Sequence, residues 1–289
     1  IANRFDGAKA TFFPRPEGHP VPVVSGLVSD RGWMAEACGT TSDRLLARFQ
    51  DAVDRPLPWQ ETREAPAQEI VHDRVDLESL FPIPTHNEHD SGAYITAGLV
   101  VTRNPASGVQ NVAIHRLQVS GPDRLGVLVL PRHTMAFYRT AAERGEDLPL
   151  AIVVGVDPAT LLSSQAVLPL DADELEVAGA LHGRPLPVVK CVTNEVRVPA
   201  RAEIVIEGRL LAEARAPEGP FGEFPQYYGE RADRHVVAVD RVTHRRAPIF
   251  HTIVGGGLEH LMLGGIPREA SLLATLRRSF PSVRDLHLS

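Results

Sequence analysis

The segment from Tyr94 to Leu130 decides the fold class, and it reads YITAGLVVTRNPASGVQNVAIHRLQVSGPDRLGVLVL. Valine, isoleucine and leucine dominate three runs within it, and residues typical of turns separate these runs. This pattern predicts consecutive β-strands joined by turns. The predicted strands are Tyr94–Thr102, Val109–Val119 and Arg124–Leu130, and the turns are Asn104–Gly108 and Ser120–Asp123.

The rest of the chain mixes strands with helices. Further strands are expected at Leu150–Val156, Leu186–Val192, Glu203–Leu211, His235–His244, Pro248–Ile253 and Val283–Leu288. Helices are expected at Met135–Arg144, at Pro158–Ser164 after an Asp157 cap, from an Asp173 cap to Leu181, and at Pro267–Arg278. We therefore predict an α/β or α+β domain built on a substantial, barrel-like sheet.

The first part of the chain, residues 1–92, differs from the rest in composition. Prolines are frequent there and surround one helical stretch, Asp30 to Val53, which Gly39–Ser42 should divide into two helices. We expect a small N-terminal α/β region over residues 1–92 and the sheet domain over residues 93–289.

Composition excludes several classes of protein. A net charge of -6 argues against nucleic acid or an anionic membrane as the main partner. The two cysteines, Cys38 and Cys191, are far apart and cannot build a disulfide framework, so we expect a reduced cytoplasmic setting. No run of 18 uncharged apolar residues occurs, which argues against membrane insertion.

Both ends of the sequence suggest a longer parent protein. The chain begins at Ile1 rather than at a methionine, and its last predicted strand, Val283–Leu288, runs almost to the end. We therefore expect residues in front of Ile1 and a further segment after Ser289.

The strongest local signal for chemistry is the turn Glu218-Gly219-Pro220-Phe221-Gly222-Glu223. A Gly-Pro-Phe-Gly turn can bring the two flanking carboxylates to one point. In an apolar pocket such carboxylates repel each other, and at least one pKa rises enough to provide a proton donor near neutral pH. The alternative is a surface turn with two solvated acids, which composition alone favours.

A second signal is the run of polar residues in Asn111-Val112-Ala113-Ile114-His115-Arg116, inside a predicted strand. Strict alternation places Asn111 and Arg116 on opposite faces. A bulge or a strand end must therefore lie between them if both serve one site. A solvated strand face is the simpler interpretation of these residues alone.

A third signal is Arg132-His133, at the junction of a predicted strand and helix. His133 could join Asn111 and a carboxylate such as Glu174 around a hard divalent ion, either Mn2+ or Mg2+. A histidine at a helix start is more often a capping or packing residue. The histidines of His86–Asp90 lack the helical spacing of a zinc site, and Gly255–Gly257 lacks the lysine of a phosphate loop, so both are interpreted as loops.

Taken together, these segments resemble the UbiD family of (de)carboxylases over nearly the whole chain. The order and spacing of the matching segments make the resemblance specific. They are Ile83–His86, Tyr94–Leu99, Thr102–Pro105, Gly108–Val112, Val154–Ala159, Pro187–Cys191, Glu203–Gly208 and Glu218–Glu223.

The resemblance implies a split β-barrel domain that binds prenylated flavin mononucleotide (prenylated FMN), which a UbiX-type prenyltransferase supplies. It implies a metal held by Asn111, His133 and Glu174, usually Mn2+, with a K+ nearby. It assigns catalysis to Arg116, which engages the substrate carboxylate, and to Glu218 and Glu223. The residues that it places at the cofactor are Asn111, Ala113, Ile114, Arg116, Arg132, His133 and Glu174.

The activity implied is removal of CO2 from an α,β-unsaturated or (hetero)aromatic carboxylic acid, with Glu223 as proton donor and Glu218 positioning Arg116. The sequence does not specify which acid is the substrate. The alternatives are a non-catalytic flavin- or metabolite-binding fragment, and a flavin-reductase-like split barrel, which needs neither the acid pair nor the metal ligands.

The sequence departs from the family at three points. Arg132 stands where many relatives have Gln or His, and His115 stands where relatives often have Tyr. Relatives also continue into a C-terminal domain that supplies cofactor contacts and most of a homo-oligomer interface. Because that domain is absent from this sequence, we expect the chain alone to hold the cofactor weakly or not at all.

Overall fold

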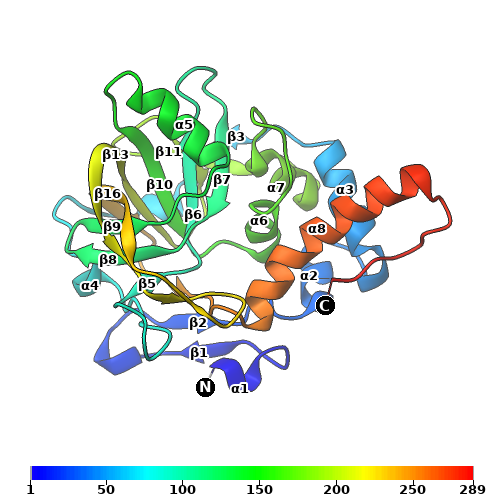
Figure 1. Ribbon diagram of the computed structural model, residues 1–289, viewed down its shortest axis with the longest axis horizontal. Helices are drawn as coiled ribbons and strands as arrows, with labels where there is room; N and C mark the ends of the chain where they lie inside the picture. The colour runs from blue at the N-terminus through cyan, green and yellow to red at the C-terminus, as the bar shows by residue number, and fades with distance from the viewer. Residues whose placement is uncertain (1, 289) are drawn as a thin grey trace.

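A computed structural model describes residues 2–288, and its centre is one curled antiparallel sheet (Figure 1). Eight strands follow one another across this sheet in the order β5-β8-β9-β16-β13-β10-β6-β7, and β4 pairs with β16 beside that path. The strands are β4 (Ile70–His72), β5 (Tyr94–Ile95), β6 (Leu99–Arg103), β7 (Gln110–Ile114), β8 (Leu117–Gly121), β9 (Arg124–Val127), β10 (Leu148–Val154), β13 (Ile204–Glu218) and β16 (Ala232–His244).

The chain connections show why the sheet curls. β7 and β8 lie near opposite ends of the strand order, yet only His115 and Arg116 separate them in sequence. A link from Ile114 to Leu117 spans at most about 11 Å, so the two edges of the sheet must approach each other. The predicted barrel-like architecture is confirmed, because this closure produces a half-barrel.

The prediction of one continuous strand over Val109–Val119 is wrong. β7 pairs with β6, whereas β8 pairs with β5 and β9, so the chain changes from one sheet edge to the other at His115–Arg116. This is the strand end that a shared site for Asn111 and Arg116 requires. Because apolar residues lie on both sides of His115–Arg116, the sequence gives no sign that one strand ends there and another begins.

Hydrophobic residues pack on both faces of the sheet. Along β10, Ala151 and Val153 belong to a core shared with the helices, and Leu150, Ile152 and Val154 belong to the core inside the half-barrel. This alternation follows from the two-residue period of a strand. The helices beside the sheet are α2 (Arg31–Ala37), α3 (Leu45–Asp54), α6 (Pro158–Ser163), α7 (Glu174–His182) and α8 (Leu258–Ser279), and α5 (His133–Ala142) packs against the half-barrel (Figure 1).

Most predicted helices are confirmed with their caps. The stretch Asp30–Val53 forms two helices, α2 and α3, as expected. Asp157 accepts a hydrogen bond from the Thr160 amide at the start of α6, and Asp173 accepts one from the Leu175 amide at the start of α7. None of the helices within residues 2–288 is both long and apolar enough to cross a membrane.

Two predictions near the C-terminus are wrong. The helix expected over Pro267–Arg278 begins nine residues earlier, at Leu258, and Pro267 lies inside it. The strand expected over Val283–Leu288 does not form; Val283 and Leu286 pack on the helix-side core, and the Leu288 amide donates to Glu269. Val283 and Leu286 are therefore half-buried against the helix-side core instead of pairing in a strand.

Strands from both predicted regions pair with one another. β2 (Val23–Ser25) lies between β1 (Thr11–Phe13) and β17 (Phe250–His251), and β3 (Gln60–Glu61) joins β11 (Pro187–Lys190) and β12 (Arg197–Pro199). The strand predicted over Pro248–Ile253 is thus reduced to β17. The division of the chain at residue 92 stays a prediction.

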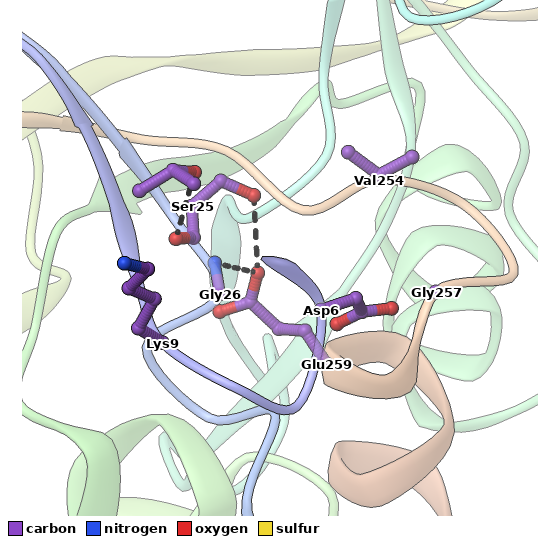
Figure 2. Close-up of a pocket in the computed structure, with 8 residues that line it drawn as sticks. Asp6, Lys9, Ser25, Gly26, Val254, Gly257 and Glu259 are labelled. Atoms are coloured by element: carbon purple, nitrogen blue, oxygen red, sulfur yellow. Dashed lines mark hydrogen bonds between the residues drawn. The ribbon is translucent and has the colours of Figure 1, made fainter. Parts of the chain in front are cut away.

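A buried carboxylate fastens the start of α8 to the strand β2 (Figure 2). Glu259 is 2% exposed and accepts hydrogen bonds from the Gly26 amide at 2.7 Å, the Val28 amide at 3.3 Å and His251 Nε2 at 3.0 Å. Burial alone would raise the pKa of Glu259. The hydrogen bond and charge of His251, together with the two amides, outweigh burial and hold that pKa below its ordinary value.

We expect Glu259→Gln to lower the free energy of unfolding by about 2 to 3 kcal/mol, because charge-assisted hydrogen bonds are lost and buried donors are left unpaired. Since the folded-state pKa is depressed, this stabilisation is present above the ordinary carboxyl pKa and is lost as pH falls through the folded-state value. Urea unfolding between pH 3 and 8 would show a constant wild-type advantage above the ordinary carboxyl pKa and a shrinking one below it. Glu36→Gln, at an exposed position of α2, is the matched control, and an equal loss in both variants contradicts the prediction.

Candidate active site

The two acids of the Glu218–Glu223 turn meet at the guanidinium group of Arg116. Arg116 Nε donates to Glu218 Oε1 at 3.0 Å and Nη2 donates to Oε2 at 2.8 Å, so this pair is bidentate. Arg116 Nη1 forms an ion pair with Glu223 Oε1. The Glu218 side chain is fully buried and that of Glu223 is 33% exposed. One acid is thus sealed inside the protein while the other is open to a ligand.

A second set of side chains lies behind Glu218. The Tyr94 hydroxyl is 3.1 Å from Glu218 Oε1, 3.2 Å from Gln118 Oε1 and 3.1 Å from Ser91 Oγ. Burial raises the pKa of Tyr94 to about 12, so its hydroxyl stays protonated at physiological pH. Tyr94 therefore presents a hydrogen-bond donor to the buried acid.

The backbone around the turn holds the two acids in place. After Glu218 ends β13, Phe221 and Gly222 form the short strand β14 (Phe221–Gly222), which pairs with β15 (Tyr228–Gly229). The Phe221 ring lies 4.5 Å from the Tyr94 ring and 5.3 Å from the guanidinium carbon of Arg116. This aromatic contact covers one face of the cation.

The loop 86–91, whose histidines lack the spacing of a zinc site, supports this turn. Asp90 Oδ1 accepts from the Gly222 amide at 2.8 Å, and Asp90 Oδ2 accepts from the Asn87 amide at 2.9 Å. The Ser91 amide also donates to the Pro220 carbonyl at 2.9 Å. The loop 86–91 thus has a structural connection to both acids.

The three predicted metal ligands lie around β7. His133 Nδ1 is 3.2 Å from Asn111 Oδ1. Glu174 is 3% exposed, and its Oε2 accepts from the amide of Val112, the residue after Asn111. Burial, opposed by that amide, raises the pKa of Glu174 to about 8. A nearby cation would offset the cost of ionising it.

The chemistry of these donors fits a hard divalent ion. An amide oxygen, an imidazole nitrogen and a carboxylate are common ligands of Mn2+ and Mg2+. Within residues 2–288, no group of three or more His, Cys, Asp and Glu side chains forms a metal cluster. The candidate set contains only two such residues beside its asparagine, so it depends on the amide oxygen of Asn111.

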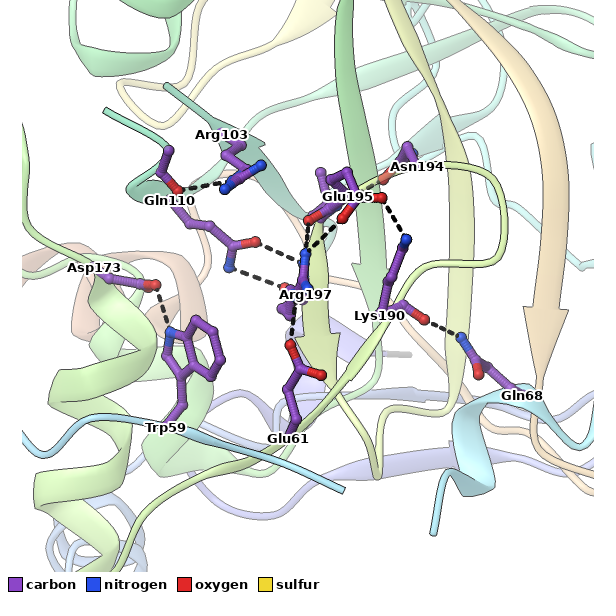
Figure 3. A network of polar contacts seen from close by, with 12 residues as sticks. Trp59, Glu61, Gln68, Arg103, Gln110, Asp173, Lys190, Asn194, Glu195 and Arg197 are labelled. Carbon is purple, nitrogen blue, oxygen red and sulfur yellow. Dashed lines mark hydrogen bonds and ion pairs between the residues drawn. The ribbon is translucent and has the colours of Figure 1, made fainter. Parts of the chain in front are cut away.

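A wider polar network anchors the elements that carry these ligands (Figure 3). Gln110, which precedes Asn111 on β7, binds the backbone of Arg197 with both its amide oxygen and its amide nitrogen. Asp173, which precedes Glu174, accepts from Trp59 Nε1 at 2.9 Å. Each anchor lies one residue before a candidate ligand, which restricts where that ligand can point.

The other predicted cofactor residues have different environments. Ala113 and Ile114 are half-buried at the end of β7, and Arg132 is exposed immediately before α5. His115 lies between the Leu128 carbonyl at 3.2 Å and Thr134 Oγ1 at 3.3 Å. Burial lowers the pKa of His115, so the ring is neutral near pH 7 and contributes shape and hydrogen bonding rather than charge.

Sequence reasoning missed three polar residues of this site: Tyr94, Gln118 and Asp90. Tyr94 and Gln118 are register partners on β5 and β8, but each lies in an apolar run that is typical of an ordinary strand. Tyr94 contacts Glu218, and Gln118 contacts Tyr94 and the Gly219 amide of the turn. These contacts depend on strand pairing, which a single sequence does not specify. Asp90 offered a weak signal, because it lies in a polar loop just before the first strand of the sheet.

Comparison with curated proteins identifies two relatives that are decarboxylases. The chain is 38% identical over 269 residues to anhydromevalonate phosphate decarboxylase of Methanothermobacter thermautotrophicus, covering 93% of this chain and 63% of that protein. It is 37% identical over 246 residues to phenolic acid decarboxylase of Bacillus subtilis, covering 83% of this chain and 50% of that protein. The chain therefore spans between half and two thirds of the length of these relatives.

Solved structures give a consistent result. The UbiD-class enzyme HmfF from Pelotomaculum thermopropionicum, in an evolved dimeric form in complex with prenylated FMN, superimposes with a TM-score of 0.98 at 49% identity. That match covers 99% of this chain and 68% of the HmfF chain. Vanillic acid decarboxylase of Sedimentibacter hydroxybenzoicus superimposes with a TM-score of 0.90 at 30% identity and covers 99% of this chain and 64% of that chain.

A model of a protein family also matches the sequence of this chain. The model described as UbiD: 3-octaprenyl-4-hydroxybenzoate carboxy-lyase Rift-related domain matches residues 60–258. This range includes the curled sheet, the Arg116 cluster and the candidate metal ligands. The chain belongs to the UbiD family.

Proposed function

We propose that this chain provides the cofactor-binding and carboxylate-binding part of a non-oxidative decarboxylase. The reaction removes CO2 from an α,β-unsaturated or (hetero)aromatic carboxylic acid with prenylated FMN. The observation that carries the proposal is the contact of Arg116 with two acids that differ in exposure, the sealed Glu218 and the accessible Glu223. Arg116 keeps its buried partner Glu218 and can exchange its exposed partner Glu223 for another carboxylate. This arrangement is suited to binding a substrate carboxylate.

Arg116 supplies the binding group. Its planar guanidinium holds the Glu218 carboxylate through two parallel hydrogen bonds, which a lysine ammonium cannot reproduce. Glu218 occupies Nε and Nη2, which leaves Nη1 for exchange between Glu223 and a ligand. Substrate binding at Nη1 would release Glu223 from its ion pair and free it for proton transfer.

Glu223 is the proposed proton donor to carbon after CO2 has left. Once Arg116 binds the substrate carboxylate instead, Glu223, whose side chain is 33% exposed, takes up a proton from solvent and delivers it to carbon. The prenylated flavin, when bound, supplies the electron sink that the departing CO2 requires. The role of the protein is to orient the acid, to hold the proton and to exclude water.

Several features support the cofactor and its metal. HmfF, at 49% identity, is described in complex with prenylated FMN and with FMN. We propose that Asn111, His133 and Glu174 bind Mn2+ or Mg2+, that a K+ lies nearby, and that Ala113, Ile114 and Arg132 line the cofactor site. Arg132 is exposed and provides a positive charge suitable for a cofactor phosphate.

The remaining parts of the proposal concern partners. A UbiX-type prenyltransferase would supply the cofactor, and the working protein would be a cytoplasmic homo-oligomer. The substrate is an unsaturated or aromatic acid, a class that includes the substrates named for the Bacillus subtilis and Sedimentibacter hydroxybenzoicus relatives. A flavin reductase would use a similar barrel but would not require an arginine bound to two acids.

We expect Glu223→Gln to retain the bound cofactor and to lose at least about 100-fold in kcat, because an amide preserves shape but cannot deliver a carboxylic proton. Cofactor content is measured by visible spectrum and mass, and turnover by CO2 release from substituted acrylic and hydroxybenzoic acids. The control is Glu88→Gln in the neighbouring loop, where the acid is exposed. Near-normal turnover of the Glu223 variant would refute the role proposed for this acid.

We expect Mn2+ binding at pH 7 to release close to one proton, because Glu174 has a pKa of about 8 and must ionise to bind a cation. The release should decline as pH rises above 8, where the carboxylate is already ionised. Calorimetry in buffers of different ionisation enthalpy measures this proton directly.

Two variants on one helix test the assignment of that proton. Glu174→Gln should weaken Mn2+ binding at least about tenfold and abolish the proton release. Glu176→Gln, two positions further along α7 and pointing elsewhere, should change neither quantity. Equal binding by the Glu174 variant and the wild type would contradict the proposed metal site.

A further inference from the structure

The hairpin of β14 and β15 directs two side-chain positions toward Arg116. Phe221 and Gly229 are register partners in this hairpin, so their side-chain directions lie on the same face of it. On that face the Phe221 ring lies 5.3 Å from the guanidinium carbon of Arg116. A side chain at position 229 would therefore also point toward the cation, but glycine supplies none.

The missing side chain leaves space beside the terminal nitrogens of Arg116. A β-carbon placed on Gly229 would lie 3.2 Å from Nη1, 3.7 Å from Nη2 and 3.7 Å from Cγ of Glu223. The first distance is shorter than an ordinary van der Waals contact, so even alanine would press on Nη1. The backbone does not require glycine here, because φ of Gly229 lies outside the left-handed region. Space is therefore the property that this glycine provides.

The other sides of the guanidinium group are already in contact with protein. Glu218 binds Nε and Nη2, Glu223 binds Nη1, and Phe221 covers one face. An arginine carries five N–H donors, and these acids use three of them. One hydrogen on each terminal nitrogen thus has no acceptor among residues 2–288, and both nitrogens lie beside Gly229.

We propose that Gly229 is a specificity-determining residue, because the space left by its missing side chain admits a carboxylate to Nη1 and Nη2 of Arg116. The ligand is the planar carboxylate of the acid substrate, whose two oxygens can accept from two parallel N–H groups. Repulsion between this carboxylate and Glu223 at Nη1 favours the release of Glu223. The inference rests on the proposed function, in which Arg116 binds the substrate carboxylate.

The first test compares Gly229→Ala with wild type in the cofactor-loaded protein. KM for the acid that is turned over best should rise at least about tenfold, because the methyl group weakens charge-assisted hydrogen bonds to the carboxylate. Gly229→Val should raise KM further. The decarboxylated product has no carboxylate to place there, so its inhibition constant should change by less than about twofold in Gly229→Ala.

Gly265→Ala on α8 is the matched control, because a β-carbon at Gly265 would meet no atom within 4 Å. This variant should change neither KM nor the inhibition constant. An unchanged KM in both variants at position 229 would overturn the proposal. Equal weakening of the acid and of the neutral product would also overturn it, because that result indicates a general distortion of the site.

A second test uses benzoate as a probe and does not depend on turnover. Calorimetry on the cofactor-free protein should show benzoate binding at least about tenfold more weakly to Gly229→Ala than to wild type. Equal binding by the two proteins contradicts the proposal, and so does a lack of benzoate binding by wild type.

A crystal structure of wild type with benzoate requires no variant that might fail to fold. The carboxylate should accept hydrogen bonds from Nη1 and Nη2 of Arg116 and lie against Cα of Gly229. A carboxylate bound on another side of Arg116 would overturn the proposal. Absence of decarboxylation by wild type would instead remove the proposed function, and the position of benzoate would still decide the role of Gly229.

Discussion

The rest of the site depends on the burial of an ion pair between Arg116 and Glu218. A buried charge is strongly unfavourable without a partner, and removing one member of such a pair typically costs about 3 to 5 kcal/mol. Here the guanidinium is 10% exposed and the carboxylate 0%, and two parallel hydrogen bonds join them. This pairing fixes the orientation of Arg116 and leaves Nη1 as the one group directed to Glu223.

The curl of the sheet is what makes this pair possible. Arg116 lies in the short link between β7 and β8, and Glu218 ends β13, near the middle of the strand order. In a flat sheet that link would have to cross the whole width. Closure into a half-barrel brings the link, the turn after β13 and the Tyr94–Gln118 pair together. Because β7 ends at Ile114, Asn111 and Arg116 do not belong to one strand. The alternation of side chains along a strand therefore does not force them to opposite faces of the sheet.

Local signals in the sequence were sufficient for much of the fold. Runs of β-branched residues located most of the sheet, although the predicted strands Tyr94–Thr102 and Val109–Val119 are each two strands. Asp157 and Asp173 predicted the starts of α6 and α7. Errors arose where the deciding interaction was distant. The start of α8 depends on the contact of Glu259 with the chain at the end of β2, and Val283 and Leu286 are half-buried against the helix-side core, so neither outcome is encoded by nearby residues.

For the site, the sequence alone indicated that Glu218 and Glu223 share a turn, and the family resemblance added Arg116. The structure brings these three residues together. It also shows Tyr94, Gln118 and Asp90 in contact with the turn or its buried acid. Tyr94 and Gln118 reach it through the pairing of β5 with β8, and Asp90 reaches it from the loop 86–91, and no spacing rule predicts either contact.

We propose that this arginine–acid cluster acts with a prenylated flavin to release CO2. The most direct test is to isolate the protein after co-production with a flavin prenyltransferase and to follow labelled CO2 from carboxyl-labelled acids. We expect release from substituted acrylic, phenolic or heteroaromatic acids when prenylated FMN is bound, and none with unmodified FMN. Equal release with both flavins, or none from any acid with prenylated FMN bound, would contradict it.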